Sequence, residues 1–205
     1  MARPIRATIS LEALRHNYGV ARHTAKGSRV LAVVKANAYG HGIDRAAAAL
    51  RDADGFGVIE LEGALRLRES GITREVLLLE GFFEARELPV LAAAGIATAV
   101  HSEEQLRMLH AAPPNPPLGV YLKINTGMNR LGFAPAKARS ALARLQESGA
   151  AKSITLMTHF ATADGPEGIE EALKRFNGAT EGRSEERRVG KECRIRCRSR
   201  WSPYH

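Results

Sequence analysis

Lys35 is the residue whose surroundings most clearly suggest chemistry. It directly follows five apolar residues, 30–34, which lack polar alternation and are rich in β-branched side chains. Such a run is typical of a strand buried on both faces, and lysine is rarely buried without a partner or a use. A desolvated lysine becomes a usable amine nucleophile of the kind that Schiff-base enzymes need. The alternative is a lysine that simply emerges into solvent where the strand ends.

The elements that would position Lys35 form a repeated pattern of an apolar run followed by a helical stretch. The further predicted strands cover residues 57–59, 76–79, 96–100, 119–122 and 154–157, and the predicted helices include 61–70, 84–94, 103–111 and 136–148. Six such units imply a parallel sheet, because parallel neighbours need a crossover that is normally a helix. A doubly wound sheet and a (β/α)8 barrel both fit, and periodicity does not separate them.

Shorter signals refine the boundaries of these elements. Three of the predicted helices are followed at once by a glycine suited to a left-handed cap, namely Gly71, Gly95 and Gly149. Ser102 and Gln105 have the spacing of a capping box. Residues 7–9 are predicted to form a separate strand, Leu11, Leu14 and Tyr18 to begin an amphipathic helix, and the proline-rich residues 113–117 to form a surface loop.

The net charge of +8 is concentrated at the C-terminal end. Residues 183–205 contain eight basic and three acidic side chains, a net +5, together with both cysteines and the only tryptophan. The rest of the chain has no cysteine, which excludes a disulfide framework or a cysteine-based metal site there. No apolar run is long enough to span a membrane, and the N-terminus lacks the apolar core of a signal peptide. A cytoplasmic protein is expected.

Residues 33–42, Val-Val-Lys-Ala-Asn-Ala-Tyr-Gly-His-Gly, resemble the cofactor-lysine signature of the alanine racemases. These are pyridoxal-phosphate enzymes of fold type III. In that family the lysine binds the cofactor as a Schiff base, and the tyrosine four residues later holds the cofactor phosphate. The resemblance gives these roles to Lys35 and Tyr39. Gly40 and Gly42 would permit a tight turn close to a ligand.

Two further segments resemble motifs of the same family, in the same order. Residues 122–133, Leu-Lys-Ile-Asn-Thr-Gly-Met-Asn-Arg-Leu-Gly-Phe, match the element whose arginine contacts the cofactor's phenolic oxygen and the substrate carboxylate. This role falls to Arg130, and Lys123 is a candidate for the carbamylation that orients the arginine. Residues 157–164 match the element whose histidine packs against the cofactor ring, which is His159 here.

The resemblance implies an incomplete (β/α)8 barrel over residues 1–182, with about six units and without the family's C-terminal β domain. Residues 183–205 fit no repeat and are expected to be translated adapter or vector sequence. The alternatives for this tail are a basic arm for nucleic acid and half a zinc site. For the latter, Cys193, Cys197 and His205 are one ligand short, so we expect no metal.

The function implied is interconversion of L- and D-alanine through pyridoxal 5'-phosphate, which supplies D-alanine for peptidoglycan. Lys35 would be the base on one face of the substrate. The family's second base is a tyrosine of the partner subunit in its homodimer, and Tyr204 does not resemble it. An unclosed barrel also leaves unpaired strand edges that favour aggregation. We therefore expect the 205-residue chain alone to be poorly stable and inactive, and we expect no nucleic-acid or membrane partner.

Two alternatives remain. The first is another fold-type III protein, a pyridoxal-phosphate carrier or an amino-acid decarboxylase, which the motif after Ala36 disfavours. The second is a non-enzymatic basic binding protein, which is weakened because the charge is confined to the tail.

Overall fold

The computed structural model describes residues 7–181. This part contains one parallel sheet of six strands in the order β1-β2-β3-β4-β5-β6. The strands are β1 Leu31–Val33, β2 Gly55–Val58, β3 Glu75–Leu78, β4 Ala97–Val100, β5 Leu118–Lys123 and β6 Ala151–Met157. A doubly wound sheet would reverse its strand order. The sequential order therefore selects the barrel type that the resemblance implied.

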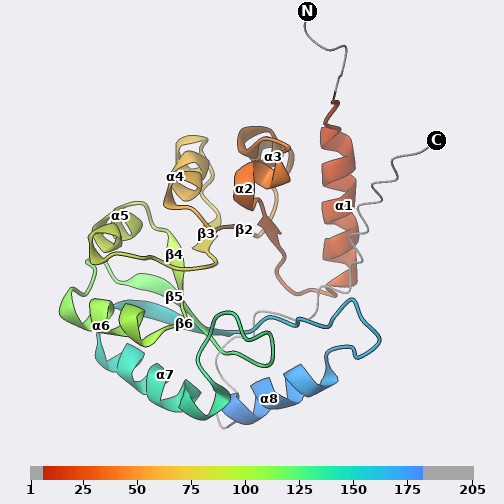
Figure 1. Ribbon diagram of the computed structural model, residues 1–205. Coiled ribbons are helices and arrows are strands. Elements are labelled where there is room, and N and C mark those ends of the chain that lie inside the picture. The colour runs from red at the N-terminus through yellow and green to blue at the C-terminus, as the bar shows by residue number, and fades with distance from the viewer. Residues whose placement is uncertain (1–6, 182–205) are drawn as a thin grey trace, which may run out of the picture.

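Helices surround this sheet on its outer side, and Figure 1 shows them as an arc with the strands inside. They are α1 Leu11–Thr24, α2 Lys35–Tyr39, α3 Ile43–Ala49, α4 Leu61–Glu69, α5 Leu88–Ala93, α6 Glu103–Ala111, α7 Ala138–Glu147 and α8 Glu170–Thr180. The predicted helices 84–94 and 136–148 each begin with a 3-10 turn, Ala85–Glu87 and Pro135–Lys137. The other predicted helices match to within one residue.

Alternate residues of the central strands pack on opposite faces of the sheet, as the two-residue period of a strand requires. Phe56, Val76 and Leu122 are fully or almost fully buried in the main core, which includes apolar residues of the outer helices. Leu77 and Tyr121 belong to a smaller cluster formed by the other face. Both faces are therefore covered in β2 to β5, which explains their continuous apolar runs.

The predicted helix caps are largely confirmed. Gly71, Gly95 and Gly149 all have positive φ, at 82°, 60° and 67°. Ser102 accepts a hydrogen bond from the Gln105 backbone N–H at 3.3 Å. The Gln105 side chain, however, accepts from the backbone N–H of His101, so the capping box is only half formed.

Two predictions near the N-terminus are wrong. Residues 7–9 form no strand but lead irregularly into α1, whose first turn is capped by Ser10. The first strand is only three residues long, and Val33 is 42% exposed. The reason is that β1 lies at one edge of the described sheet and pairs only with β2. The premise that residues 30–34 are buried on both faces therefore fails.

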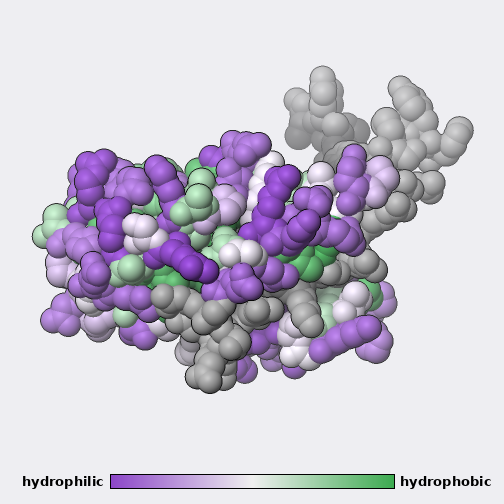
Figure 2. Space-filling model, turned by 90° about the horizontal axis from the view of Figure 1, so that it is seen from below, coloured by the Kyte–Doolittle hydropathy of each residue, from purple (hydrophilic) through white to green (hydrophobic). Residues whose placement is uncertain are grey.

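Polar side chains cover most of the face seen from below in Figure 2. The described helices include none that is both long and apolar enough to cross a membrane. The loop at residues 113–117 lies between α6 and β5, as expected. The predictions for residues 183–205, among them Cys193, Cys197 and Tyr204, lie outside the described residues.

Candidate active site

Ionisable side chains follow all six strands at the edge where the parallel strands end. They are Lys35 after β1, Glu60 after β2, Glu80 after β3, His101 after β4, Lys123 at the end of β5 and His159 after β6. Active sites of parallel α/β folds are built at this edge. The sheet order brings these strand ends side by side.

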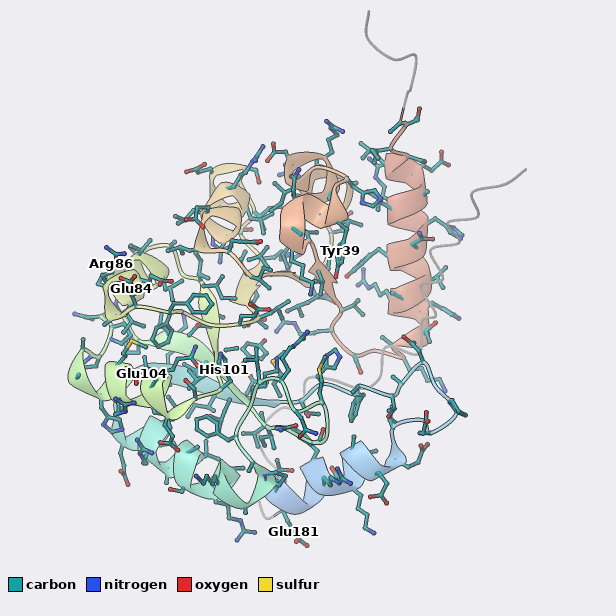
Figure 3. All side chains as sticks on the ribbon, in the orientation of Figure 1. Tyr39, Glu84, Arg86, His101, Glu104 and Glu181 are labelled. Carbon is teal, nitrogen blue, oxygen red and sulfur yellow. The ribbon has the colours of Figure 1, made fainter. Side chains whose placement is uncertain are left out.

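The segment after Lys35 is a left-handed helical turn. Residues 36–39 have φ values of 50°, 53°, 54° and 53°, a conformation that costs residues other than glycine roughly 1–2 kcal/mol each. Lys35 Nζ lies 6.0 Å from the centroid of the Tyr39 ring. Tyr39 is 61% exposed and faces the inside of the arc of helices (Figure 3). The turn therefore brings together the two residues that the first motif singled out.

Several hydrogen bonds hold this turn in place. The backbone N–H of Gly42 donates to the carbonyl of Asn37 at 2.9 Å. The Asn37 side chain accepts from the N–H of Ile43 at 2.9 Å and so ties the turn to α3. His41 donates from ring Nδ1 to the carbonyl of Ala38 at 2.7 Å. Gly42 has a φ of 91°, which confirms the expected glycine turn.

Lys123 is the buried lysine of the site, with 6% of its surface exposed. Burial lowers the pKa of its amine, and the positive charges of Arg130 and Lys35 lower it further, while Glu80 opposes them. Lys35, by contrast, is only partly buried. The desolvation that the sequence suggested for Lys35 is therefore found at Lys123.

Arg130 lies on a closed loop that leaves β5 and returns to it. The backbone N–H of Phe133 donates to the carbonyl of Lys123, and the N–H of Asn125 donates to the carbonyl of Phe133, both at 2.9 Å. Gly132 has a φ of 118°, and a Cβ there would come within 2.7 Å of the Asn125 nitrogen. The loop returns to the end of β5, where the charge of the exposed Arg130 acts on Lys123.

His159 follows β6, and threonines join its strand to the Arg130 loop. Thr158 donates to the carbonyl of Ile124 at 2.8 Å, so the hydroxyl of Thr126 donates to that of Thr158, also at 2.8 Å. His159 is exposed on one side. Desolvation of the rest of the ring lowers its pKa, and the charges of Lys123, Arg130 and Lys35 lower it further. Lys35, Lys123, Arg130 and His159 thus form one electrostatic cluster.

Sequence reasoning missed Glu80 and His101. His101 is half-buried, and burial lowers the pKa of its ring, with a smaller contribution from Lys123. Figure 3 shows His101 between α6 and the middle of the molecule. The signal that identified Lys35, a polar residue directly after an apolar run, also applies to Glu80 after residues 76–79 and to His101 after residues 96–100.

The cluster suits a small anion that also carries a carbonyl group. Arginine and lysine bind phosphate and carboxylate groups, and a partly exposed lysine can react with an aldehyde. Pyridoxal phosphate, a phosphorylated aldehyde, therefore fits this set of donors. Within residues 7–181, no group of three histidine, cysteine or acidic side chains is arranged to hold a metal ion.

Comparisons with known proteins agree with this geometry. The family model of the alanine racemase N-terminal domain matches residues 9–197. The alanine racemase of Ralstonia pickettii is 53% identical over 182 residues, which cover 89% of this chain and 49% of that protein. The chain thus spans about half the length of the curated relatives it matches.

Solved structures give the same picture. The biosynthetic alanine racemase of Pseudomonas aeruginosa superposes with a TM-score of 0.83 at 41% identity, over 88% of this chain and 51% of that one. A histidine racemase from Leuconostoc mesenteroides superposes with a TM-score of 0.77 at 26% identity, over 90% of this chain and 51% of that one.

Proposed function

This chain belongs to the family of the alanine racemase N-terminal domain, and from this premise we propose that it forms the pyridoxal-phosphate-binding part of an alanine racemase. The observation that carries the proposal is the cluster of Lys35, Lys123, Arg130 and His159 at the strand ends. Relatives named alanine racemase, which are 53% and 51% identical to this chain, support the proposal.

Each of these residues has a distinct part in the proposed chemistry. Lys35 holds the cofactor covalently and, once released, exchanges a proton with the substrate Cα. Tyr39 binds the cofactor phosphate, and His159 packs against its ring. Arg130 binds the cofactor's phenolic oxygen and the substrate carboxylate, for which a guanidinium group is well shaped. When bound, the cofactor supplies the electron sink that makes the Cα–H bond of an amino acid acidic.

We propose alanine as the substrate and D-alanine supply for peptidoglycan as the role, with a homodimer as the assembly. The similar fold of a histidine racemase makes the substrate a question of its own. Exchange of the Cα hydrogen in deuterated water, measured by NMR with alanine, serine and histidine on a protein that spans the full length of these relatives, would separate these substrates. It would also separate a racemase from a pyridoxal-phosphate carrier.

We further propose that Lys123 reacts with carbon dioxide. Carbamylation requires the neutral amine, whose nitrogen bonds to the carbon of CO2 while a proton leaves to solvent. Burial favours the neutral amine, because desolvation disfavours the charged form and lowers the pKa of Lys123. The product is a carboxylate, which would face the guanidinium of Arg130.

Reductive trapping tests the covalent step. We would incubate the 205-residue chain with pyridoxal phosphate, reduce it with borohydride and map the modified peptides by mass spectrometry. The expected result is a pyridoxyl group on Lys35. A label spread evenly over the lysines, or centred on another one, would contradict the proposal.

A further inference from the structure

Asn125 is a polar side chain of the Arg130 loop that the proposed function does not use. Its Oδ1 accepts from the backbone N–H of Gly127 at 3.0 Å and from that of Asn129 at 3.1 Å. Its Nδ2 donates to Oδ1 of Asn129, also at 3.1 Å. One amide group therefore makes three hydrogen bonds across the loop, and two of them reach the residue directly before Arg130.

Asn125 is itself fixed to the end of the sheet. Its backbone N–H donates to the carbonyl of Phe133 at 2.9 Å, and it directly follows Ile124, which is 1% exposed. The carbonyl of Ile124 accepts from the hydroxyl of Thr158 at 2.8 Å, which joins this point to the segment after β6. The half-buried Asn125 is therefore a firm base for the hydrogen bonds that it makes to the loop.

The residue that Asn125 binds sets the course of the chain at Arg130. Asn129 has a φ of 57°, a left-handed conformation that asparagine adopts more readily than most residues. Arg130 is exposed, and none of the ion pairs within residues 7–181 includes it. The place from which its guanidinium extends therefore depends on the backbone that Asn129 and Asn125 hold.

Other contacts hold a different part of the loop. The hydroxyl of Thr126 hydrogen-bonds to that of Thr158 at 2.8 Å, and the carbonyl of Thr126 accepts from Arg175 at 3.3 Å. These bonds fix the residue at the start of the loop. The bonds of Asn125 extend farther, to the residue next to Arg130.

We propose that Asn125 is a positioning residue, which binds Asn129 and so fixes the backbone from which Arg130 contacts the cofactor. The inference rests on the proposed function for the contact that Arg130 makes. The effect of Asn125 on the loop can be measured without any cofactor.

The first measurement is NMR of the 15N-labelled 205-residue chain without cofactor. Asn125→Ala should lower the heteronuclear NOE of the Arg130 backbone N–H, because the loop gains fast motion. It should also speed hydrogen exchange of the Asn129 N–H, which loses its acceptor. Asn125→Asp retains an acceptor oxygen and should keep both values close to those of the unaltered chain. Asn17→Ala, at an exposed position of α1, is the matched control and should change neither.

The second measurement is the apparent Kd of pyridoxal phosphate, taken from the visible absorbance of its adduct with each variant. Arg130→Ala should weaken binding roughly tenfold, because a hydrogen bond from a charged group is lost, and Asn125→Ala about threefold. In the Arg130→Ala background, Asn125→Ala should have no additional effect, because residues that act through one another are not additive. A general loss of structure would weaken both backgrounds alike. Asn125→Asp should bind like the unaltered chain.

Three results would overturn the proposal: an unchanged NOE of Arg130 in Asn125→Ala, equal weakening by Asn125→Ala in both backgrounds, or normal binding by Arg130→Ala. An amide fingerprint spectrum checks the fold of each variant, and if Asn125→Ala does not fold, Asn125→Ser takes its place. Borohydride trapping at Lys35 reports on the proposed function separately. If it finds no label there, that function fails, and the NMR measurements still decide whether Asn125 fixes Arg130.

Discussion

Two lysines stand at the same edge of the sheet, and their surroundings differ in almost every respect. Lys35 is partly exposed, follows a short edge strand and starts a left-handed turn of four non-glycine residues. Lys123 is 6% exposed, ends a six-residue strand between β4 and β6, and has a lowered pKa. If Lys35 binds the cofactor as proposed, burial by itself does not identify the cofactor lysine.

The sequence analysis treated burial and reactivity as properties of one lysine, whereas the structure divides them between Lys123 and Lys35. A lysine that forms and breaks a covalent bond with a cofactor must be reachable from solvent. A lysine that orients a neighbour by its charge benefits from burial, because electrostatic effects are stronger where water is excluded. On this reasoning Lys35 is the reacting amine, and Lys123 is a fixed group beside Arg130.

The largest expected effect is the loss of covalent labelling when the two lysines are replaced in turn. Lys35→Ala should abolish the pyridoxyl label after borohydride reduction, because no other described lysine directly precedes the left-handed turn. Lys123→Met should still be labelled at Lys35. Peptide mapping measures both. Retained labelling of Lys35→Ala, at Lys123 in particular, would reverse the assignment of roles.

The next effect concerns carbon dioxide. In buffer with 13C-bicarbonate, we expect a carbamate resonance that is absent from Lys123→Arg and present in Lys35→Arg. It should increase as the pH rises through the pKa of Lys123, since only the neutral amine reacts. Its presence in Lys123→Arg and absence from Lys35→Arg would show that burial does not select the carbamylated lysine.

The backbone around Lys35 provides an effect of about 1 kcal/mol. Ala36 is exposed and has a φ of 50°, so Ala36→Gly should relieve strain and stabilise the chain by about 0.5–1 kcal/mol after the entropy of the unfolded glycine is included. Ala48 is equally exposed but lies in the regular helix α3. Ala48→Gly should therefore destabilise by about 1 kcal/mol.

Urea unfolding of both variants measures this pair. The same chemical change is expected to have opposite signs at the two positions, so a general effect of glycine cannot imitate the result. Destabilisation by Ala36→Gly of the same size as Ala48→Gly would mean that the left-handed turn is not strained. The Lys35 region would then lose one of the features that distinguish it from the end of β5.

Much of this arrangement could be predicted from the sequence. Apolar runs placed all six strands to within three residues at either end, and the position of Lys35, Lys123 and His159 at strand ends follows from those runs. The order in which the strands pair decided between a doubly wound sheet and a barrel. No single apolar run indicates that order. The resemblance to the alanine racemases had already indicated a barrel and therefore a sequential strand order.

The remaining features depend on contacts that are distant in sequence. The exposure of Val33 follows from the edge position of β1, whereas the burial of Lys123 requires neighbours on both sides of β5. The left-handed conformation of residues 36–39 could not be predicted either, because alanine and tyrosine ordinarily avoid positive φ. Gly40 and Gly42 indicated a turn but not the conformation of the residues before them.

The smallest expected effect is the contribution of His159, a neighbour of Lys123 in the cluster, to the pH dependence of the protein's stability. The folded protein lowers the pKa of His159, first by desolvation and then through Lys123, Arg130 and Lys35. Below the ordinary histidine pKa of about 6.5, the unfolded chain therefore binds more protons than the folded one. Stability from this group is complete above that pH and is lost as the pH falls through the lower pKa of the folded state.

His159→Gln should consequently flatten the fall of Tm between pH 7.5 and 5, as thermal unfolding at several pH values would show. The change should be small, because His159 is exposed on one side and solvent screens its neighbours. His110→Gln, at an exposed position of α6, is the control and should leave the slope as it is. If both variants give the slope of the unaltered chain, neither desolvation nor the positive charges near Lys123 lower the pKa of His159. The cluster would then reduce to Lys123, Arg130 and Lys35, and the contrast between the two lysines would rest on burial and backbone geometry.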